Sequence, residues 1–295
     1  MSDEQRAQHV GLIGLGLLGK ALAQRLIASG YMVTGYDIEP TAREAAAILG
    51  VAVVDSPDAV SEACATILLS LPNSEIRTEL LFGETRWADT LAEGTLLLDT
   101  TTGRAEDLER DAERLRGMDI YLVDVCVLAS SAQVGGADAV LLVGDGEARA
   151  VGYAPVLACF APRVFYLGKP GDGCRMKLVA NQVVGLNRLV LAEALGLAEH
   201  VGLNPETTLD VLQSGLAASA VMVTKGRKML ERDFEPVARL AQHAKDVDLI
   251  LELGGKSGAD LPLSTLHQRI LKDLIDRGHG GEDNSVVMRA FESDC

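Results

Sequence analysis

Positive charge is scarce in this 295-residue sequence, in which 27 lysines and arginines stand against 42 aspartates and glutamates, giving a formal net charge of −15. Nucleic acids and anionic lipid surfaces are bound by faces rich in Lys and Arg. We therefore expect no nucleic-acid partner and no membrane partner. Apolar residues make up 48% of the chain and charged residues 23%, which is typical of a soluble globular protein.

Cysteine pairs, histidine clusters and long apolar runs are also lacking. The cysteines have no C-x-x-C pair and the histidines no metal-ligand spacing, so we expect reduced thiols, surface or core histidines, and no metal site. The start, MSDEQRAQHV, lacks the basic and apolar regions of a secretory signal, which favours a cytoplasmic protein. Charged and amide residues interrupt the longest apolar stretch, 176–203, so we do not expect it to span a membrane. The five cysteines are Cys64, Cys126, Cys159, Cys174 and Cys295.

The first part of the chain, up to Gly168, alternates short β-branched runs with helical patterns. This alternation predicts an α/β fold with a Rossmann-type, doubly wound parallel sheet, in which helices cross between strands. Helices are expected near 17–29 and 41–49. Strands are expected at 9–13, 32–36, 51–54, 66–71, 95–99, 120–123, 140–143 and 163–167.

The second part shows only helical periods from about Asp172 onward. Its first helix, 174–201, would be roughly 40 Å long. Because this helix is apolar nearly all round, we expect it to be buried and to bridge two domains. The predicted domains are residues 1–168, which bind a dinucleotide, and residues 169–295, an all-helical domain for substrate binding and dimerisation.

A glycine-rich turn, GLGLLG, directly follows the first predicted strand and opens the first helix. Its G-x-G-x-x-G spacing gives one glycine for a tight turn, one for close approach of a pyrophosphate, and one for helix–strand packing. The helix N-terminus adds unpaired N–H groups for the phosphates. The predicted cofactor contacts here are Gly14, Leu15, Gly16, Leu17, Leu18 and Gly19.

Asp37 ends the second predicted strand, at about the 20-residue spacing where an acidic residue binds a ribose 2′-OH. A carboxylate there repels a 2′-phosphate, and Glu39 follows, so NAD is favoured over NADP. Two alternatives stay open. Asp37 could simply begin the turn before Pro40, and Arg43 could still accept NADP.

Four stretches make the chain resemble the 3-hydroxyisobutyrate dehydrogenase family of β-hydroxyacid dehydrogenases along essentially its whole length. GLGLLG is similar to the family's G-L-G-x-M-G, with Leu18 in place of Met. GDGCRMKLVAN, residues 171–181, matches G-x-G-x-x-x-K-x-x-x-N. AKDVDL is similar to K-D-L-x-L-A, and DTTT resembles D-x-S-T. The resemblance implies that Lys245 reaches the cofactor and that Thr101 lies beside the nicotinamide.

The loop after the fourth predicted strand is also expected to contact the cofactor. LPNSE is similar to the family's L-P-x-x-x-x turn, where Leu71 and Pro72 would border the adenosine and ribose; a plain turn is the alternative.

Lys177 and Asn181 stand at i and i+4, on one helix face. The resemblance favours Lys177 as general acid–base, with Asn181 orienting it or the substrate hydroxyl. A solvated helix face is the other interpretation.

The family's D-A-P-V-S-G-G turn, which receives the substrate carboxylate, is altered here to DVCVLAS. Leu128 replaces the serine, while Ala129 and Ser130 replace both glycines. Leucine cannot donate a hydrogen bond, and the added Cβ atoms change the outline of the pocket. Ser130, Ser131 or Gln133 could supply a replacement donor.

These observations predict an NAD(P)-dependent oxidoreductase that interconverts a small hydroxy acid, or a related alcohol, with its aldehyde or ketone. Imine reduction is an alternative in the same class, although relatives that do this usually lack the lysine. A dinucleotide-binding module without catalysis is the alternative from another class, supported only by the altered turn. The apolar long helix fits a homodimer or a higher homo-oligomer.

Overall fold

The structure, a computed structural model, describes residues 8–292. Residues 1–7, which carry part of the argument against a secretory signal, and Cys295 lie outside the described residues. The chain divides into two compact units, with the boundary between Lys177 and Leu178.

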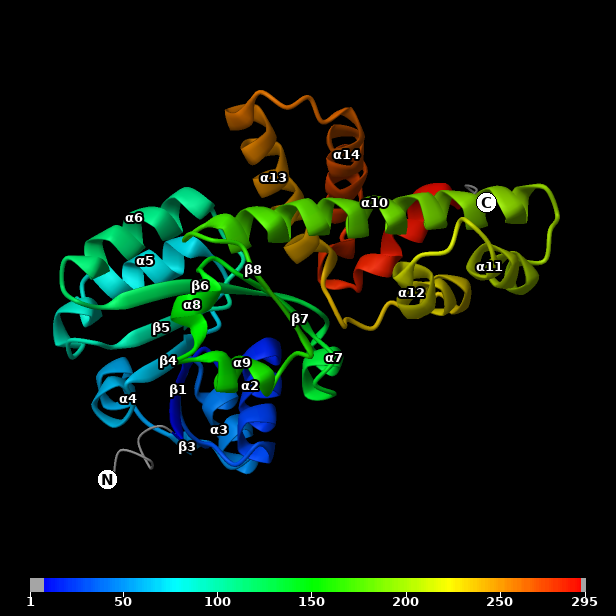
Figure 1. The fold of residues 1–295 in the computed structure, drawn as a ribbon. Helices are drawn as coiled ribbons and strands as arrows, with labels where there is room; N and C mark the ends of the chain where they lie inside the picture. Colours follow the sequence, from blue (N-terminus) through cyan, green and yellow to red (C-terminus); the bar gives the residue numbers. More distant parts are fainter. Residues whose placement is uncertain (1–7, 293–295) are drawn as a thin grey trace. The chain divides into compact units, whose positions relative to one another are not determined.

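The first unit is built on an eight-stranded sheet with the order β3-β2-β1-β4-β5-β6-β7-β8 (Figure 1). Every predicted strand is present, and three have the predicted bounds. The others differ at their ends, most of all β6, which runs five residues further than expected. The strands are β1 (His9–Ile13), β2 (Met32–Tyr36), β3 (Ala52–Val53), β4 (Thr66–Leu69), β5 (Leu96–Asp99), β6 (Tyr121–Leu128), β7 (Val140–Val143) and β8 (Arg163–Tyr166).

One strand pair corrects the prediction of a wholly parallel sheet. All neighbouring strands pair in parallel except β6 and β7, which pair antiparallel. Only residues 129–139, with the short helix α7 (Ser131–Gly135), connect these two strands. A parallel return needs a longer crossover, so a connection of this length reverses the chain direction.

Helices cover both faces of the sheet, as a doubly wound fold requires. In β4, Leu68 belongs to one apolar cluster, while Ile67 and Leu69 belong to another. Leu22 from α2 packs in the first cluster and Leu108 from α6 in the second. The helices of this unit are α2 (Leu17–Ala28), α3 (Pro40–Ile48), α4 (Pro57–Ala63), α5 (Ser74–Phe82), η1 (Trp87–Thr90), α6 (Ala105–Arg116), α7, α8 (Glu147–Ala150) and α9 (Ala154–Ala158).

Helix starts are set by local chemistry. Ser56 before α4 and Asn73 before α5 each accept a hydrogen bond from the backbone N–H three residues later. Such caps satisfy an N–H group that lacks a partner in the first turn. Asn73 directly follows the Leu71–Pro72 pair, so the cap fixes where this turn ends and α5 begins.

The second unit is helical throughout the residues described, as predicted. Its core is formed by leucine, valine and methionine side chains of several helices, with Leu195, Met229 and Leu271 among the most buried. The helices that form it are α10 (Asp172–His200), whose first residues belong to the first unit, α11 (Pro205–Ser214), α12 (Ala220–Glu231), α13 (Leu240–Ser257), α14 (Pro262–Asp276), η2 (His279–Gly281) and η3 (Asn284–Phe291).

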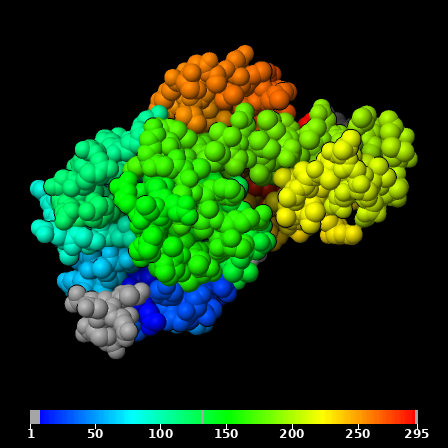
Figure 2. Space-filling view, viewed as in Figure 1, coloured from blue at the N-terminus to red at the C-terminus, as the bar shows by residue number. Residues whose placement is uncertain are grey.

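The long helix α10 has nearly the predicted bounds, but it is not buried all round. One run of aliphatic side chains on it is exposed, and part of this helix surface is visible in Figure 2. By length and composition α10 could cross a membrane, with a window of mean hydropathy 1.2 that is 39% buried. This is weak evidence, since core helices of soluble proteins pass the same test. The exposed side chains are Val179, Val183, Val190 and Leu197.

Candidate active site

The glycine-rich turn connects β1 to α2. Gly14 has a φ of +95°, and a Cβ on it would lie 2.2 Å from the carbonyl oxygen of Ser70. A Cβ on Gly19 would lie 2.0 Å from the carbonyl oxygen of Gly14, so the helix closes directly onto the turn. Gly16 has open space around its Cβ position. The positive φ of Gly14 and the close packing at Gly19 are those of a tight turn that leads into a helix, and the open space at Gly16 leaves room for a ligand beside it.

The N-terminus of α2 fits a pyrophosphate. No side chain caps this helix at Gly16, and its first turn carries no acidic residue. The N–H groups there, at the positive end of the helix dipole, therefore meet no competing carboxylate in that turn. The turn thus has the shape and the charge that a dinucleotide phosphate requires.

Asp37 lies beside the same turn. Its carboxylate accepts hydrogen bonds from the backbone N–H of Leu15, at 2.6 Å, and of Glu39, at 2.9 Å. Arg43 donates to the backbone carbonyls of Asp37 and Ile38. The structure therefore brings Asp37 to the glycine-rich turn and places Arg43 close by. Both the ribose-binding interpretation and the NADP alternative involve residues at this point.

A second group of predicted residues meets at the ends of β4 and β5. The backbone N–H of Leu71 donates to Thr101 Oγ1 at 3.3 Å. The backbone N–H of Thr101 in turn donates to Asp99 Oδ1 at 3.0 Å. Pro72 follows Leu71 in the loop before α5. The two motifs LPNSE and DTTT, far apart in sequence, thus lie side by side where β4 and β5 end, at the carboxyl edge of the sheet.

Arg77 connects the end of β5 to α6 through two buried ion pairs, and the sequence pattern did not indicate it. Its fully buried guanidinium contacts Asp99 Oδ2 at 2.7 Å and Asp111 Oδ2 at 3.1 Å. Burial alone would lower the pKa of Arg77, but the two carboxylates raise it above its ordinary value. Nothing in the local sequence marks Arg77, because its partners come from β5 and α6.

Lys177 is buried, with 9% of its surface exposed, which contradicts a solvated helix face. Its Nζ donates to the backbone carbonyl of Val127 at 2.6 Å. Val127 immediately precedes Leu128, the last residue of β6. The structure therefore places the amine of Lys177 at the beginning of the turn predicted to bind substrate.

The altered turn after β6 is internally bonded. Both the backbone N–H and the hydroxyl of Ser130 contact Gln133 Oε1, at 3.0 and 3.1 Å. The oxygen of Gln133 is thereby occupied, and its side-chain nitrogen is the donor left at this exposed residue. Ala129 packs partly against an apolar cluster of the sheet. The side chain of Ser131 lies outside the described part of the structure.

In the helical unit, Asn181 and Lys245 are linked by Asp246. Asn181 Nδ2 donates to Asp246 Oδ2 at 3.1 Å, and Lys245 Nζ lies 3.9 Å from Asp246 Oδ1. Asp246 is largely buried and was missed as a separate site residue, although it stands in the AKDVDL motif. Its place directly after Lys245 in that motif was the available indication.

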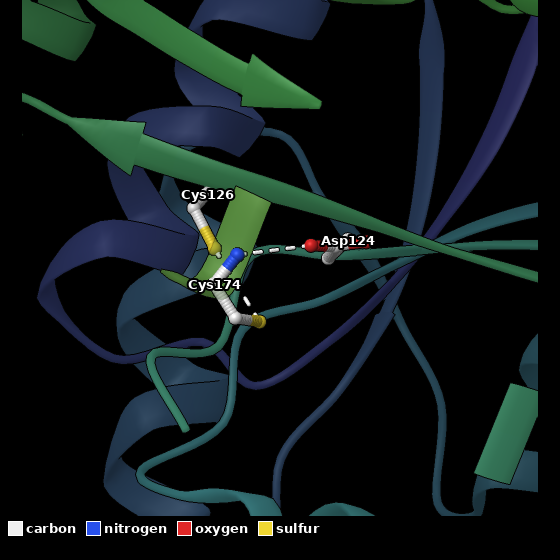
Figure 3. Close-up of side chains that lie close together, drawn as sticks. All are labelled: Asp124, Cys126 and Cys174. Carbon is white, nitrogen blue, oxygen red and sulfur yellow. Dashed lines mark hydrogen bonds between the residues drawn. The ribbon is translucent and has the colours of Figure 1, made fainter. Parts of the chain in front are cut away.

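Two cysteines that are far apart in sequence meet beside Asp124 (Figure 3). The sulfur atoms of Cys126 and Cys174 are 3.8 Å apart. The ligand atoms of all three residues lie within 4.8 Å of one another, a grouping that could hold a metal ion. Their contacts have another explanation, however. Both carboxylate oxygens of Asp124 accept backbone N–H groups, and the contact with Cys126, followed by burial, raises the pKa of the Cys174 thiol well above its usual range.

Comparison with known proteins agrees with this geometry. Residues 9–168, more than half of the chain, match the family model for the NAD binding domain of 6-phosphogluconate dehydrogenase. Residues 171–291 match the model described as NAD-binding of NADP-dependent 3-hydroxyisobutyrate dehydrogenase. The two matches meet near the start of α10.

Relatives and a solved structure extend over nearly the whole chain. L-threonate dehydrogenase of Cupriavidus necator is 28% identical over 290 residues, which is 97% of this chain and 96% of that protein. 2-Hydroxy-3-oxopropionate reductase of Escherichia coli is 27% identical over 285 residues, 96% of this chain and 97% of that one. The structure of Mycobacterium tuberculosis 3-hydroxyisobutyrate dehydrogenase with L-serine superposes with a TM-score of 0.86 and 25% identity, covering 97% of this chain and 99% of the other.

The glycine turn and the loops after β4 and β5 lie in the part of the chain that the first model matches. The buried lysine, Lys177, lies in the part that the second model matches. The relatives named as dehydrogenases and reductases favour catalysis on hydroxy compounds over imine reduction and over a non-catalytic binding module. The chain belongs to the β-hydroxyacid dehydrogenase family of the 3-hydroxyisobutyrate dehydrogenase type, and it is an NAD(P)-dependent oxidoreductase.

Proposed function

We propose that this enzyme interconverts a small hydroxy acid and its aldehyde or ketone, with Lys177 as the general acid–base. The observation that carries the proposal is the buried amine of Lys177, held at Val127 beside the altered turn. A buried, positioned amine next to a substrate-binding turn can exchange a proton with the reacting oxygen.

The bound nicotinamide supplies or accepts the hydride. In the oxidative direction, the substrate hydroxyl gives its proton to the neutral amine of Lys177 as the C–H bond gives up its hydride, and the C–O bond becomes a carbonyl. In the reductive direction, the ammonium of Lys177 donates the proton to the oxygen. Asn181, one helical turn after Lys177 and held by Asp246, orients the hydroxyl or the lysine.

The cofactor residues proposed here are those of the glycine turn together with Leu71, Pro72, Thr101 and Lys245. The N–H groups of α2 would hold the pyrophosphate, and Asp37 would accept the ribose hydroxyls. Lys245, the neighbour of Asp246, would also contact the cofactor, as the family resemblance implies.

Replacing Asp37 with alanine tests the choice of cofactor. The carboxylate accepts a 2′-OH and repels a 2′-phosphate, so we expect the variant to bind NAD more weakly and to discriminate less between NAD and NADP. Titration of both cofactors against wild type and variant measures this. Because Asp37 also bonds the turn at Leu15, thermal unfolding of the variant must be checked as well. A wild-type preference for NADP would contradict the prediction and implicate Arg43.

Substrate identity is tested with a panel of hydroxy acids, alcohols and aldehydes, assayed with both cofactors. Leu128 puts an apolar branched group where the family has a serine, so we propose a substrate with an apolar or larger group near the reacting carbon. We expect 3-hydroxyisobutyrate to be poor, with kcat/KM below about 10⁴ M⁻¹ s⁻¹. Leu128→Ser should improve it roughly 10-fold or more by restoring a hydrogen bond to the carboxylate.

The control for this change is Leu216→Ser, because Leu216 is fully exposed in the other unit and should leave the kinetics unchanged. The triple change of residues 128–130 to Ser-Gly-Gly tests whether Ala129 and Ser130 also restrict the pocket. Efficient wild-type turnover of 3-hydroxyisobutyrate would show that the altered turn is neutral. Absence of turnover with every member of the panel would count against the proposed reaction.

The same proposal includes a cytoplasmic homodimer or larger homo-oligomer. Support comes from the exposed aliphatic side chains of α10, which a second copy of the chain would cover. Light scattering of the purified protein gives the mass that decides between monomer and oligomer.

A further inference from the structure

The carboxylate of Asp124 is completely buried at the point where the chain enters α10. Asp124 Oδ1 accepts the backbone N–H of Gly171 at 3.0 Å, and Oδ2 accepts that of Cys174 at 2.9 Å. One of these N–H groups precedes α10 and the other lies in its first turn, where helix N–H groups lack partners of their own. Asp124 therefore caps α10 from a neighbouring strand of the sheet (Figure 3).

Two glycines make room for this carboxylate between backbone segments. A Cβ on Gly144 would lie 1.9 Å from Asp124 Oδ1, and a Cβ on Gly173 would lie 2.7 Å from Oδ2. The backbone N–H of Gly144 also donates to the backbone carbonyl of Asp124. The carboxylate therefore packs closely against the backbone at Gly144 and Gly173, and its hydrogen bonds connect β6 to the start of the helix.

Strand β6 and helix α10 make two more contacts just after Asp124. Cys126 contacts Cys174, and the carbonyl of Val127 accepts the amine of Lys177. Cys174 and Lys177 are three residues apart, close to one helical turn, so both project toward β6. Fixing the backbone of Cys174 therefore fixes the direction in which Lys177 leaves the helix.

We propose that Asp124 is a positioning residue, which acts through the first turn of α10 to hold the Lys177 amine at its working place. This inference rests on the proposed role of Lys177. Hydrogen bonds that backbone N–H groups donate to a charged carboxylate are stronger than neutral ones, so a neutral replacement loosens the helix start. A catalytic group displaced by as little as 1 Å can lose much of its rate.

The test is Asp124→Asn, made in the wild-type and in the Lys177→Ala enzyme. The amide keeps the size of the side chain but turns an –NH₂ group toward one of the two N–H donors. We expect kcat to fall roughly 10- to 100-fold in the wild-type background, with the KM for the cofactor little changed. In the Lys177→Ala background the same change should have little further effect, because its route through Lys177 is gone.

The matched control is Asp172→Asn. Asp172 is an acidic residue at the same helix start, but it is partly exposed and paired with Arg175. This variant should keep the wild-type kcat. Equal losses of kcat from Asp124→Asn in both backgrounds would show a general structural role and overturn the proposal.

Hydrogen exchange of the wild-type protein gives an answer even if Asp124→Asn does not fold. The amides of Gly171 and Cys174 should exchange slowly, since both donate to a buried carboxylate. Exchange as fast as in exposed loops would overturn the proposal. A slow Lys177→Ala enzyme with an unaffected Asp124→Asn enzyme would reject only the role of Asp124, whereas a fully active Lys177→Ala enzyme would reject the role of Lys177 itself.

Discussion

Replacing Lys177 with alanine is expected to lower kcat about 10²- to 10⁴-fold, the usual contribution of a general acid–base group. The reason is positional: the amine is buried and bonded to Val127, beside the proposed substrate turn. Binding of NAD should stay close to the wild-type strength, because the proposed contacts with the pyrophosphate and the ribose are made elsewhere. Steady-state kinetics with the best substrate of the panel, together with cofactor titration, measure both effects.

Lys169→Ala is the matched control, since Lys169 is exposed and lies shortly before α10. It should leave kcat unchanged. If Lys177→Ala turned over at the wild-type rate, another group would have to move the proton, and the assignment of Lys177 would be wrong.

Arg77→Met should lower the free energy of unfolding by about 3–5 kcal/mol, the typical cost of removing one partner from a buried ion pair. The methionine would leave the carboxylates of Asp99 and Asp111 buried without the guanidinium that both contact. Asp111 keeps a hydrogen bond from the hydroxyl of Thr78 and a 3.6 Å contact with the exposed guanidinium of Arg110, which together compensate only in part. Urea unfolding monitored by the single tryptophan, buried Trp87, gives the difference.

Arg116→Met provides the comparison, because Arg116 forms an exposed pair with Glu113. Exposed pairs contribute about 1 kcal/mol or less. A loss for Arg77→Met no greater than for Arg116→Met would mean that the buried carboxylates find other partners, and that Arg77 does not determine the stability of this sheet edge.

Most of the sheet could be predicted because buried parallel strands have a strong local pattern. The runs HVGLI and MVTGY gave the bounds of β1 and β2 directly. The extension of β6 to Leu128 was missed because its residues 124–128 were interpreted as a family turn, although CVL continues the apolar run. The antiparallel pairing of β7 depends on the length of the connection, which the strand patterns themselves do not contain.

The candidate site, too, could be predicted from the sequence only in part. The glycine turn was proposed from the spacing of a local motif. Lys177 and Asn181 were proposed because their motif resembles that of the family, and their roles stay predictions. Arg77 and Asp124 could not be assigned roles, because their partners come from other strands and helices. The burial expected for α10 was wrong on one face, since composition gives the mean apolarity of a helix but not the number of neighbours that surround it.

The strand reversal after Leu128 bears on how freely the proposed substrate turn can be varied in sequence. Residues 129–139 leave the sheet and return without a crossover, so their sequence can vary without shifting the register of β1 to β5. Val134 is completely buried and anchors the connection, whereas Gln133 is exposed. A laboratory library randomised at 128–130 and 133, with Val134 kept, would therefore explore new specificities on an unchanged cofactor-binding scaffold.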